Sequence, residues 1–237
     1  WMRRMDRLTS LGQLSAGIAH EIRNPLASIN FNIQLLPKRL DLDEKSKKLI
    51  ENSLVGVDRI KSLVKGMLDF SRPTPPLLKR DSIHHAIEES VSLLESQIKK
   101  HGIRVETEFE RESPDIVFDS RQIQQVFVNL LLNAMEAMPT GGTVKIGSRI
   151  EPAKGKSDGF LVIYVSDTGV GIPRKDLSKI FDPFFTTKSE GTGLGLSIAH
   201  KILEQHGALI DIRSREGAGT TFILRFPIDG EKNNVSI

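Results

Sequence analysis

The sequence predicts an α+β protein, in which a helical hairpin that forms a dimeric four-helix bundle is followed by an α/β sandwich domain. Three observations support this fold class: a long helical period of apolar residues before residue 72, a proline cluster at 73–76, and mixed helix and strand patterns after it. Three prolines in those four positions cannot lie inside a helix and favour an extended spacer. We therefore expect a hairpin at 1–72, a linker at 73–80, a sandwich domain at 81–230 and a C-terminal tail at 231–237.

Apolar residues in the first part recur every three or four positions, which is the period of one face of an α-helix. They are Leu8, Leu11, Leu14, Ile18, Ile22, Leu26, Ile29, Ile33 and Leu36. Pro37 and the largely polar stretch from Asp41 to Lys48 indicate a turn, after which the helical period resumes from Leu49 to Met67. A lone hairpin has too little core to bury both apolar stripes, so burial alone predicts a homodimer across a two-fold axis.

The rest of the chain alternates between helical and strand periods. Helices are expected at 83–100, 121–138 and 194–206, and strands at 103–109, 143–150, 160–166, 209–214 and 220–226. Helices and strands mixed within one compact unit of about 150 residues predict packed layers around one core.

Composition excludes several classes of function. The 237 residues contain no cysteine, which excludes a disulfide scaffold, thiolate zinc sites and thiol nucleophiles. A net charge of +3 and 5% aromatic residues do not indicate a nucleic-acid partner. No apolar run approaches the roughly 18 residues of a membrane segment. Trp1 is not a translational start and no signal peptide follows it, so we expect a cytosolic fragment of a longer protein.

The first candidate site is His20-Glu21-Ile22-Arg23-Asn24-Pro25. His20 lies about 200° around the helix from the apolar residues beside it, so its imidazole is expected to face solvent. Glu21 is close enough to bond the ring, Asn24 lies above it on the same face, and Pro25 should bend the helix. An imidazole oriented by a carboxylate is a potential nucleophile, although an ordinary surface histidine beside an acid has the same pattern.

A second group of motifs points to a bound phosphate compound. Asn129 and Asn133 lie four apart on one helix face, and their amide oxygens suit Mg²⁺ that already carries phosphate oxygens; a capping or solvated pair is the alternative. Asp167 begins the glycine turn Asp-Thr-Gly-Val-Gly, where an acceptor suits an exocyclic amine such as that of adenine. A plain Asp-Gly turn would look the same.

A glycine stretch at 191–195 then opens a helix, and its backbone amides could cradle phosphates. It lacks the Lys-Ser/Thr of a P-loop. Before it stands Phe181-Asp182-Pro183-Phe184-Phe185-Thr186-Thr187-Lys188, which resembles a mobile lid anchored by phenylalanines. Lys188 could approach the terminal phosphate from this lid.

Taken together, these residues resemble the catalytic core of a two-component sensor histidine kinase over nearly the whole chain. The matching segments are an H box at 20–26, an N box at 129–134, a first glycine box at 167–171, an F box at 181–185, a second glycine box at 191–195 and a glycine-threonine box at 217–222. The H and N boxes look most like the nitrogen-regulation-type subgroup. Glu136 departs from the pattern, because many relatives carry a basic or aromatic residue there.

The resemblance implies a dimerisation and phosphotransfer hairpin followed by a Bergerat-type ATP-binding domain, as in gyrase, Hsp90 and MutL. It implies that Asp167 binds the adenine amine, Thr220 supports it through water, and Asn133 with Asn129 holds Mg²⁺. The expected nucleotide-binding residues are Asn129, Asn133, Asp167, Gly169, Gly171, Lys188, Gly191, Thr192, Gly193, Leu194, Gly195 and Thr220.

The expected function is that of an ATP-dependent protein histidine kinase, located in the cytoplasm alone or as the cytoplasmic part of a membrane-anchored sensor. His20 would attack the γ-phosphorus, Glu21 would accept or orient the ring proton, and the phosphoryl group would pass to an Asp of a response regulator receiver domain. Asn24 would serve in dephosphorylating that regulator.

Two alternatives are a Bergerat-fold clamp ATPase and an anti-sigma-type serine kinase. The first generally has a glutamate at the position of Asn129, and the second has no use for His20. The other histidines, at 84, 85, 101, 200 and 206, are expected to be surface or packing residues.

Overall fold

The computed structural model describes residues 22, 24–37, 40, 42–71, 75–152, 159–188 and 191–228. The chain forms two compact units. One comprises the N-terminal helical part together with residues 182–198, and the other comprises residues 75–181 and the chain from Ala199 onward. No helix within the described ranges is long and apolar enough to cross a membrane.

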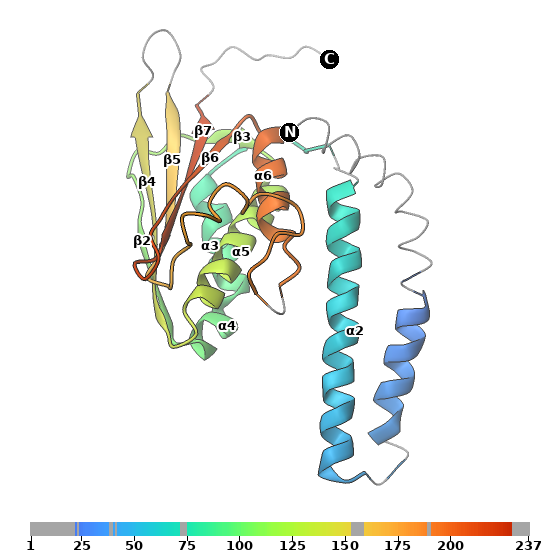
Figure 1. Ribbon diagram of the computed structural model, residues 1–237. Coiled ribbons are helices and arrows are strands. Elements are labelled where there is room, and N and C mark those ends of the chain that lie inside the picture. The colour runs from blue at the N-terminus through green and yellow to red at the C-terminus, as the bar shows by residue number, and fades with distance from the viewer. Residues whose placement is uncertain are drawn as a thin grey trace. The chain divides into compact units, whose positions relative to one another are not determined.

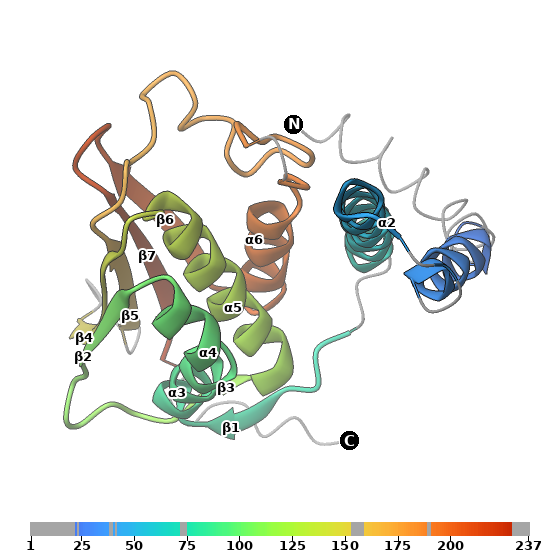
Figure 2. The same cartoon turned by 90° about the horizontal axis from the view of Figure 1, so that it is seen from below.

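The N-terminal part is a helical hairpin. Residues 24–37 are helical, and α2 (Glu44–Ser71) runs antiparallel beside them (Figures 1 and 2). Leu26 and Val57 are buried within this part. Other apolar side chains of the two helices are exposed in the single chain, namely Ile22, Ile29, Phe31, Leu36, Leu49, Val55 and Ile60. The described hairpin therefore leaves much of its apolar surface uncovered.

The turn predicted at 41–48 is wrong in its second half, because α2 already begins at Glu44. Asp43 caps the first turn of the helix: its Oδ1 accepts a hydrogen bond from the Ser46 main-chain N–H at 2.8 Å. Hydrogen bonds from the side chain and main chain of Ser46 hold the pKa of Asp43 below its ordinary value. The polar run is thus a cap followed by an exposed helical turn.

The second unit contains a five-stranded sheet in the order β2-β4-β5-β7-β6. Its strands are β2 (Ile103–Glu108), β4 (Gly142–Glu151), β5 (Phe160–Asp167), β6 (Leu209–Ser214) and β7 (Thr220–Pro227). β2 and β4 are parallel and the other pairs are antiparallel.

Helices α3 (Ile83–Leu93), α5 (Ser120–Ala137) and α6 (Gly195–Gln205) cover one face of this sheet (Figures 1 and 2). The core between the two layers is apolar and includes the fully buried Ile87, Phe127, Leu130, Leu161, Ile163, Leu203 and Leu224. The predicted α+β class with a sandwich of helices on a sheet is confirmed.

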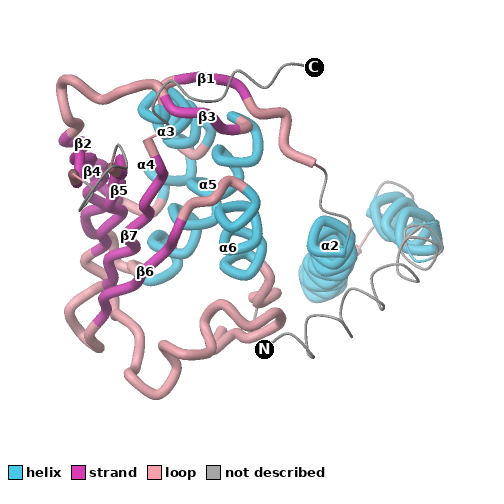
Figure 3. The backbone as a smooth tube through the Cα atoms, turned by 90° about the horizontal axis from the view of Figure 1, so that it is seen from above, coloured by secondary structure: helices cyan, strands magenta, loops and turns pink. Residues whose placement is uncertain are grey.

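Two local features differ from the prediction. The single helix expected at 83–100 breaks at Leu94, whose φ of −101° and ψ of 5° are not helical, so that α4 (Glu95–Lys100) is separate from α3. A two-stranded antiparallel ribbon of β1 (Lys79–Asp81) and β3 (Ile116–Phe118) was not expected (Figure 3). The segment predicted as a linker at 73–80 therefore includes the first two residues of a strand.

Candidate functional site

The end of β5 holds a carboxylate in a fixed orientation. Asp167 is half-buried, and its Oδ1 accepts hydrogen bonds from the main-chain N–H of Gly169 at 2.8 Å and of Thr220 at 3.2 Å. Thr220 is the register partner of Asp167 on β7. An ionised carboxylate has about four acceptor positions and no donor. The geometry therefore presents an oriented acceptor that suits an amine.

The loop after Asp167 is built so tightly that only glycine fits at two positions. A Cβ on Gly169 would lie 2.7 Å from the carbonyl oxygen of Ala137. A Cβ on Gly171, where φ is +70°, would lie 2.1 Å from the carbonyl oxygen of Arg215. The N–H of Val170 donates to the Ala137 carbonyl at 3.1 Å, which anchors the loop to the last turn of α5. The close backbone approach expected from the glycines is present.

The two predicted metal ligands lie on α5, toward the end that anchors this loop. Asn133 is one helical turn before Ala137 and Asn129 is one turn earlier, and both are half-buried. The part of the chain that the structure describes contains no cluster of three or more His, Cys, Asp or Glu residues that could hold a metal ion. Two neutral amides fit Mg²⁺ when phosphate oxygens supply the remaining ligands.

A serine that the sequence reasoning missed joins the loop to the β6–β7 turn. Ser214 Oγ accepts from the Ile172 N–H at 2.8 Å and lies 3.0 Å from the Thr220 hydroxyl. It also donates to the Gly219 carbonyl at 3.0 Å. The turn is further tied to the loop by the Gly217 N–H, which donates to the Val170 carbonyl at 2.7 Å. Ser214 lies opposite Thr220 because of the register of β6 with β7. The sequence pattern alone does not give this register, so it did not indicate Ser214.

The remaining predicted nucleotide residues lie in the other compact unit. Gly193 has a φ of +67°, and a Cβ there would meet the carbonyl carbon of Phe184 at 2.4 Å. The Phe184 N–H donates to the Gly193 carbonyl at 2.9 Å, and Phe184 itself has a φ of +66°. A left-handed conformation costs a non-glycine residue about 1–2 kcal/mol. The F box and the second glycine box are thus joined by this hydrogen bond, and both Phe184 and Gly193 have left-handed backbone conformations.

The other predicted nucleotide residues of this unit make contacts with residues close to them in the sequence. A Cβ on Gly191 would lie 2.5 Å from Thr186 Oγ1, and the same oxygen accepts from the Lys188 N–H at 3.1 Å. Thr192 Oγ1 accepts from the Leu194 N–H at 3.4 Å, and α6 begins at the next residue, Gly195. The structure therefore assembles two groups. Asp167, Thr220, the loop glycines and the α5 asparagines lie in one unit, and Lys188 with residues 191–195 lies in the other.

The hairpin site is described only in part. Asn24 is exposed on the helix over 24–37, as expected, and Pro25 lies within the same helical stretch. His20 and Glu21 lie outside the described residues. Among the other histidines, His206 is buried, and His84 stacks on Phe109 with ring centroids 4.3 Å apart.

Family models match both parts of the chain. Residues 118–230 match the histidine kinase-, DNA gyrase B- and HSP90-like ATPase family, and residues 10–76 match the His Kinase A (phospho-acceptor) domain. The sensor histidine kinase ZraS of Escherichia coli K12 is 35% identical over 228 residues, which cover 96% of this chain and 48% of ZraS. The chain thus spans about half the length of that curated relative.

Solved structures of histidine kinases are similar as well. The catalytic domain of histidine kinase ThkA is 37% identical with a TM-score of 0.54, and the match covers 63% of this chain and 95% of that domain. ThkA in complex with the response regulator protein TrrA is 34% identical with a TM-score of 0.69, covering 98% of this chain and 66% of that one. With both domain families matched in order along it, the chain belongs to the sensor histidine kinases and comprises the catalytic core of a two-component kinase.

Proposed function

We propose that this chain is an ATP-dependent protein histidine kinase that phosphorylates its own His20 and passes the phosphoryl group to an Asp of a response regulator. The observation that carries the proposal is the Asp167 carboxylate, oriented by two main-chain amides in a loop whose glycines leave no room for a Cβ. This acceptor lies within the matched ATPase region, and His20 lies within the matched phospho-acceptor domain.

The two domains have different proposed roles. Residues 1–72 form the dimerisation and phosphotransfer hairpin, residues 73–80 connect, and residues 81–230 bind ATP. Asp167 accepts from the adenine amine, with Thr220 acting through water. The residues around Gly191, Gly193 and Gly195 line the triphosphate at the N-terminus of α6, where main-chain amides favour anions.

Asn133, helped by Asn129, would hold Mg²⁺. When bound there, the ion would offset negative charge on the phosphates.

The transfer requires a nucleophile that lies in line with the γ-phosphorus and the bridging oxygen of the leaving ADP. A ring nitrogen of His20 forms the new N–P bond while the bond from the γ-phosphorus to the bridging oxygen of ADP breaks, and ADP leaves with that electron pair. Glu21 accepts the ring proton or orients the ring so that the attacking nitrogen keeps its lone pair. Catalysis is then mainly positioning and electrostatics.

The proposed partners are a second copy of the chain and a response regulator. Exposed apolar side chains on both hairpin helices, such as Ile29, Phe31 and Ile60, support a homodimer that covers them. The solved complex of ThkA with a response regulator supports the second partner. The nitrogen-regulation-type subgroup stays a prediction, as does a phosphatase activity that uses Asn24.

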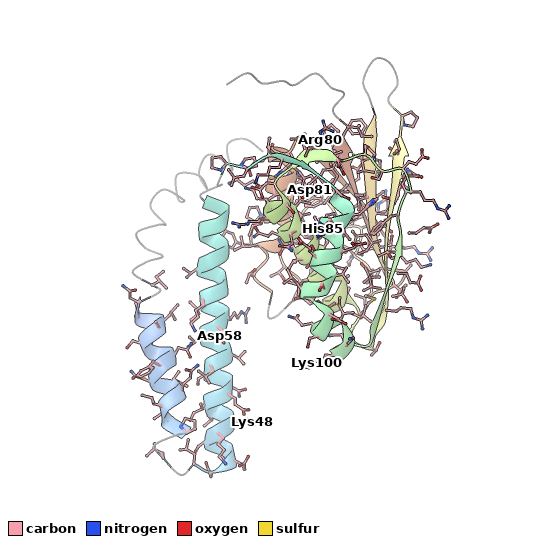
Figure 4. All side chains as sticks on the ribbon, turned by 180° about the vertical axis from the view of Figure 1, so that it is seen from behind. Lys48, Asp58, Arg80, Asp81, His85 and Lys100 are labelled. Atoms are coloured by element: carbon pink, nitrogen blue, oxygen red, sulfur yellow. The ribbon has the colours of Figure 1, made fainter. Side chains whose placement is uncertain are left out.

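Labelling with γ-labelled MgATP tests the proposal. The wild-type chain should acquire an acid-labile, alkali-stable adduct, as expected of a phosphoramidate, and His20→Ala should acquire none. His85→Ala is the matched control, because His85 is an exposed histidine on α3 (Figure 4) that pairs with Glu89 at 3.4 Å. Undiminished labelling of His20→Ala would favour a serine kinase, and ATP hydrolysis without labelling would favour a clamp ATPase.

A further inference from the structure

A row of three polar side chains crosses strands β5, β7 and β6 at the candidate adenine site. Asp167 is the register partner of Thr220, and Thr220 is the register partner of Ser214. Register partners point to the same face of a sheet, with Cβ atoms about 5 Å apart. The three groups therefore form one continuous row on that face, and Thr220 stands between the other two.

The direction of each hydrogen bond in this row follows from the donors and acceptors around Ser214. The Ile172 N–H, 2.8 Å from Ser214 Oγ, can only donate to it. The Gly219 carbonyl, 3.0 Å away, can only accept, so it takes the single proton of the serine hydroxyl. The third contact, 3.0 Å to Thr220 Oγ1, is then a hydrogen bond only if Thr220 is the donor.

This direction determines what Thr220 offers to a ligand. Its hydroxyl proton points to Ser214, so the remaining side of Oγ1 carries only lone pairs. The Asp167 carboxylate beside it is also an acceptor. A water molecule between two such acceptors donates both of its protons to them, and so it too only accepts from the base.

We propose that Ser214 is a positioning residue that sets the nucleobase preference of the site. By keeping the Thr220 proton away from the ligand, it favours a purine with an amine at position 6 and disfavours one with a carbonyl there. A site that offers only acceptors leaves the carbonyl oxygen of a 6-oxo purine without a hydrogen-bond donor. This missing hydrogen bond lowers the affinity for such a base. The inference rests on the proposed nucleotide site, and it adds that Ser214 determines the direction in which the Thr220 hydroxyl donates its hydrogen bond.

The test compares ADP and GDP binding to the full chain by calorimetry in the presence of Mg²⁺. In Ser214→Ala the Thr220 hydroxyl can rotate and donate, so the ratio of the GDP Kd to the ADP Kd should fall about tenfold, the effect of one redirected hydrogen bond. Ser214→Thr keeps the hydroxyl and should keep the wild-type ratio. Thr221→Val is the matched control, because the Thr221 hydroxyl bonds to Ser166 at 2.9 Å on the opposite face.

If Ser214 had a merely structural role, Ser214→Ala would weaken the binding of ADP and of GDP by the same factor. An unchanged ratio of the two Kd values in Ser214→Ala would therefore overturn the proposal. Thr220→Val removes the hydroxyl and keeps the side-chain shape, which provides a second test if Ser214→Ala does not fold. Thr220→Val should weaken the binding of ADP and lower the ratio of the GDP Kd to the ADP Kd. A ratio equal to that of the wild type would also overturn the proposal. If the wild-type chain binds neither nucleotide, the proposed function is itself wrong.

Discussion

The main-chain N–H of Asp119 donates to Nε2 of the buried His206 at 3.0 Å, which joins the start of α5 to the end of α6. Because that nitrogen accepts, the proton of the ring is on Nδ1, which lies 2.7 Å from the Ile202 carbonyl. The Asp119 carboxylate caps α5 through the N–H of Arg121 and also accepts from the Leu77 N–H at 2.7 Å. One residue thus connects two helices and the segment before β1.

Stability of this junction should depend on pH. Burial opposes ionisation of Asp119, but hydrogen bonds from the main-chain N–H groups of Leu77, Gln122 and Arg121 outweigh it and hold the pKa below the ordinary 3.8. The contribution is therefore present above pH 3.8 and is lost as the pH falls through the lower folded value. Asp119→Asn keeps a capping oxygen but loses the charge, so we expect a loss of about 1–3 kcal/mol at pH 7.

The free energy of unfolding in urea, measured at pH 7 and about pH 3, checks this prediction. The difference between Asp119→Asn and wild type should shrink toward the acid end, because below pH 3.8 the unfolded wild-type chain takes up the proton first and the stability of the wild type falls. Asp115→Asn, an exposed carboxylate in the same unit, should show no such pattern. A difference that is independent of pH would contradict the prediction.

Asp167→Asn should weaken ATP binding by about 1.5–3 kcal/mol, since a charge-assisted acceptor is replaced by an amide whose NH₂ faces the adenine amine. The amide oxygen can still accept from Gly169 and Thr220, so the loop and the dimer should remain intact. Calorimetry gives the affinity and sedimentation gives the oligomeric state. Unchanged ATP affinity would show that the adenine contact is assigned to the wrong residue.

Two glycines with left-handed φ should respond differently to alanine. Gly171 (φ +70°) faces the Arg215 carbonyl, whereas nothing lies within 4 Å of a Cβ on Gly217 (φ +77°). Both substitutions incur a conformational cost of about 1 kcal/mol, but only Gly171→Ala also clashes with backbone. We expect Gly217→Ala to bind nucleotide nearly as wild type does, and Gly171→Ala to lose most binding and more stability. Similar unfolding free energies for the two variants would refute this.

Asn24→Ala should separate two activities. The Asn24 amide is exposed and could orient a water toward the phosphorylated Asp of a regulator, whereas autophosphorylation would use His20 and Glu21. We expect Asn24→Ala to keep substantial autokinase activity and lose most phosphatase activity. The measurement is the decay of purified phosphorylated regulator with ADP present, with Asn32→Ala, another exposed amide on the same helix, as control. Equal decay in wild type and Asn24→Ala would exclude the role, and loss of both activities would mean that Asn24 supports the helix at Pro25.

The helices and strands of the second unit could be located from the sequence because their apolar periods are long and regular. The expected strand at 160–166 is β5 with one further residue, and the helix expected at 121–138 is α5 displaced by one residue. By contrast, β1 and β3 have three residues each, which is too short to show a period of two. Asp43 looked like part of a turn because capping residues and turn residues are the same types.

The site could be predicted as a set of residue types but not as a geometry. Asp167 and Thr220 were expected to act together because of the family resemblance, yet their contact depends on the antiparallel register of β5 with β7 across 53 positions of sequence. Ser214 carried no signal, because a serine at a strand end is commonplace. The left-handed Phe184 could not be foreseen either, since phenylalanine has no preference for that conformation.

The place of β7 in the sheet has a consequence for biosynthesis. Among the described residues, β7 is the last strand along the chain, but it lies between β5 and β6 in the sheet. A ribosome-bound chain therefore cannot complete the sheet interior until residues 220–227 have emerged, and β6 has no partner until then. Because the same strand supplies the Thr220 amide to Asp167, a product that terminates before β7 lacks both a complete sheet and one of the two amides that orient the Asp167 carboxylate. Incomplete chains are thus expected to be unable to consume ATP and to present unpaired strand edges to the quality-control proteases.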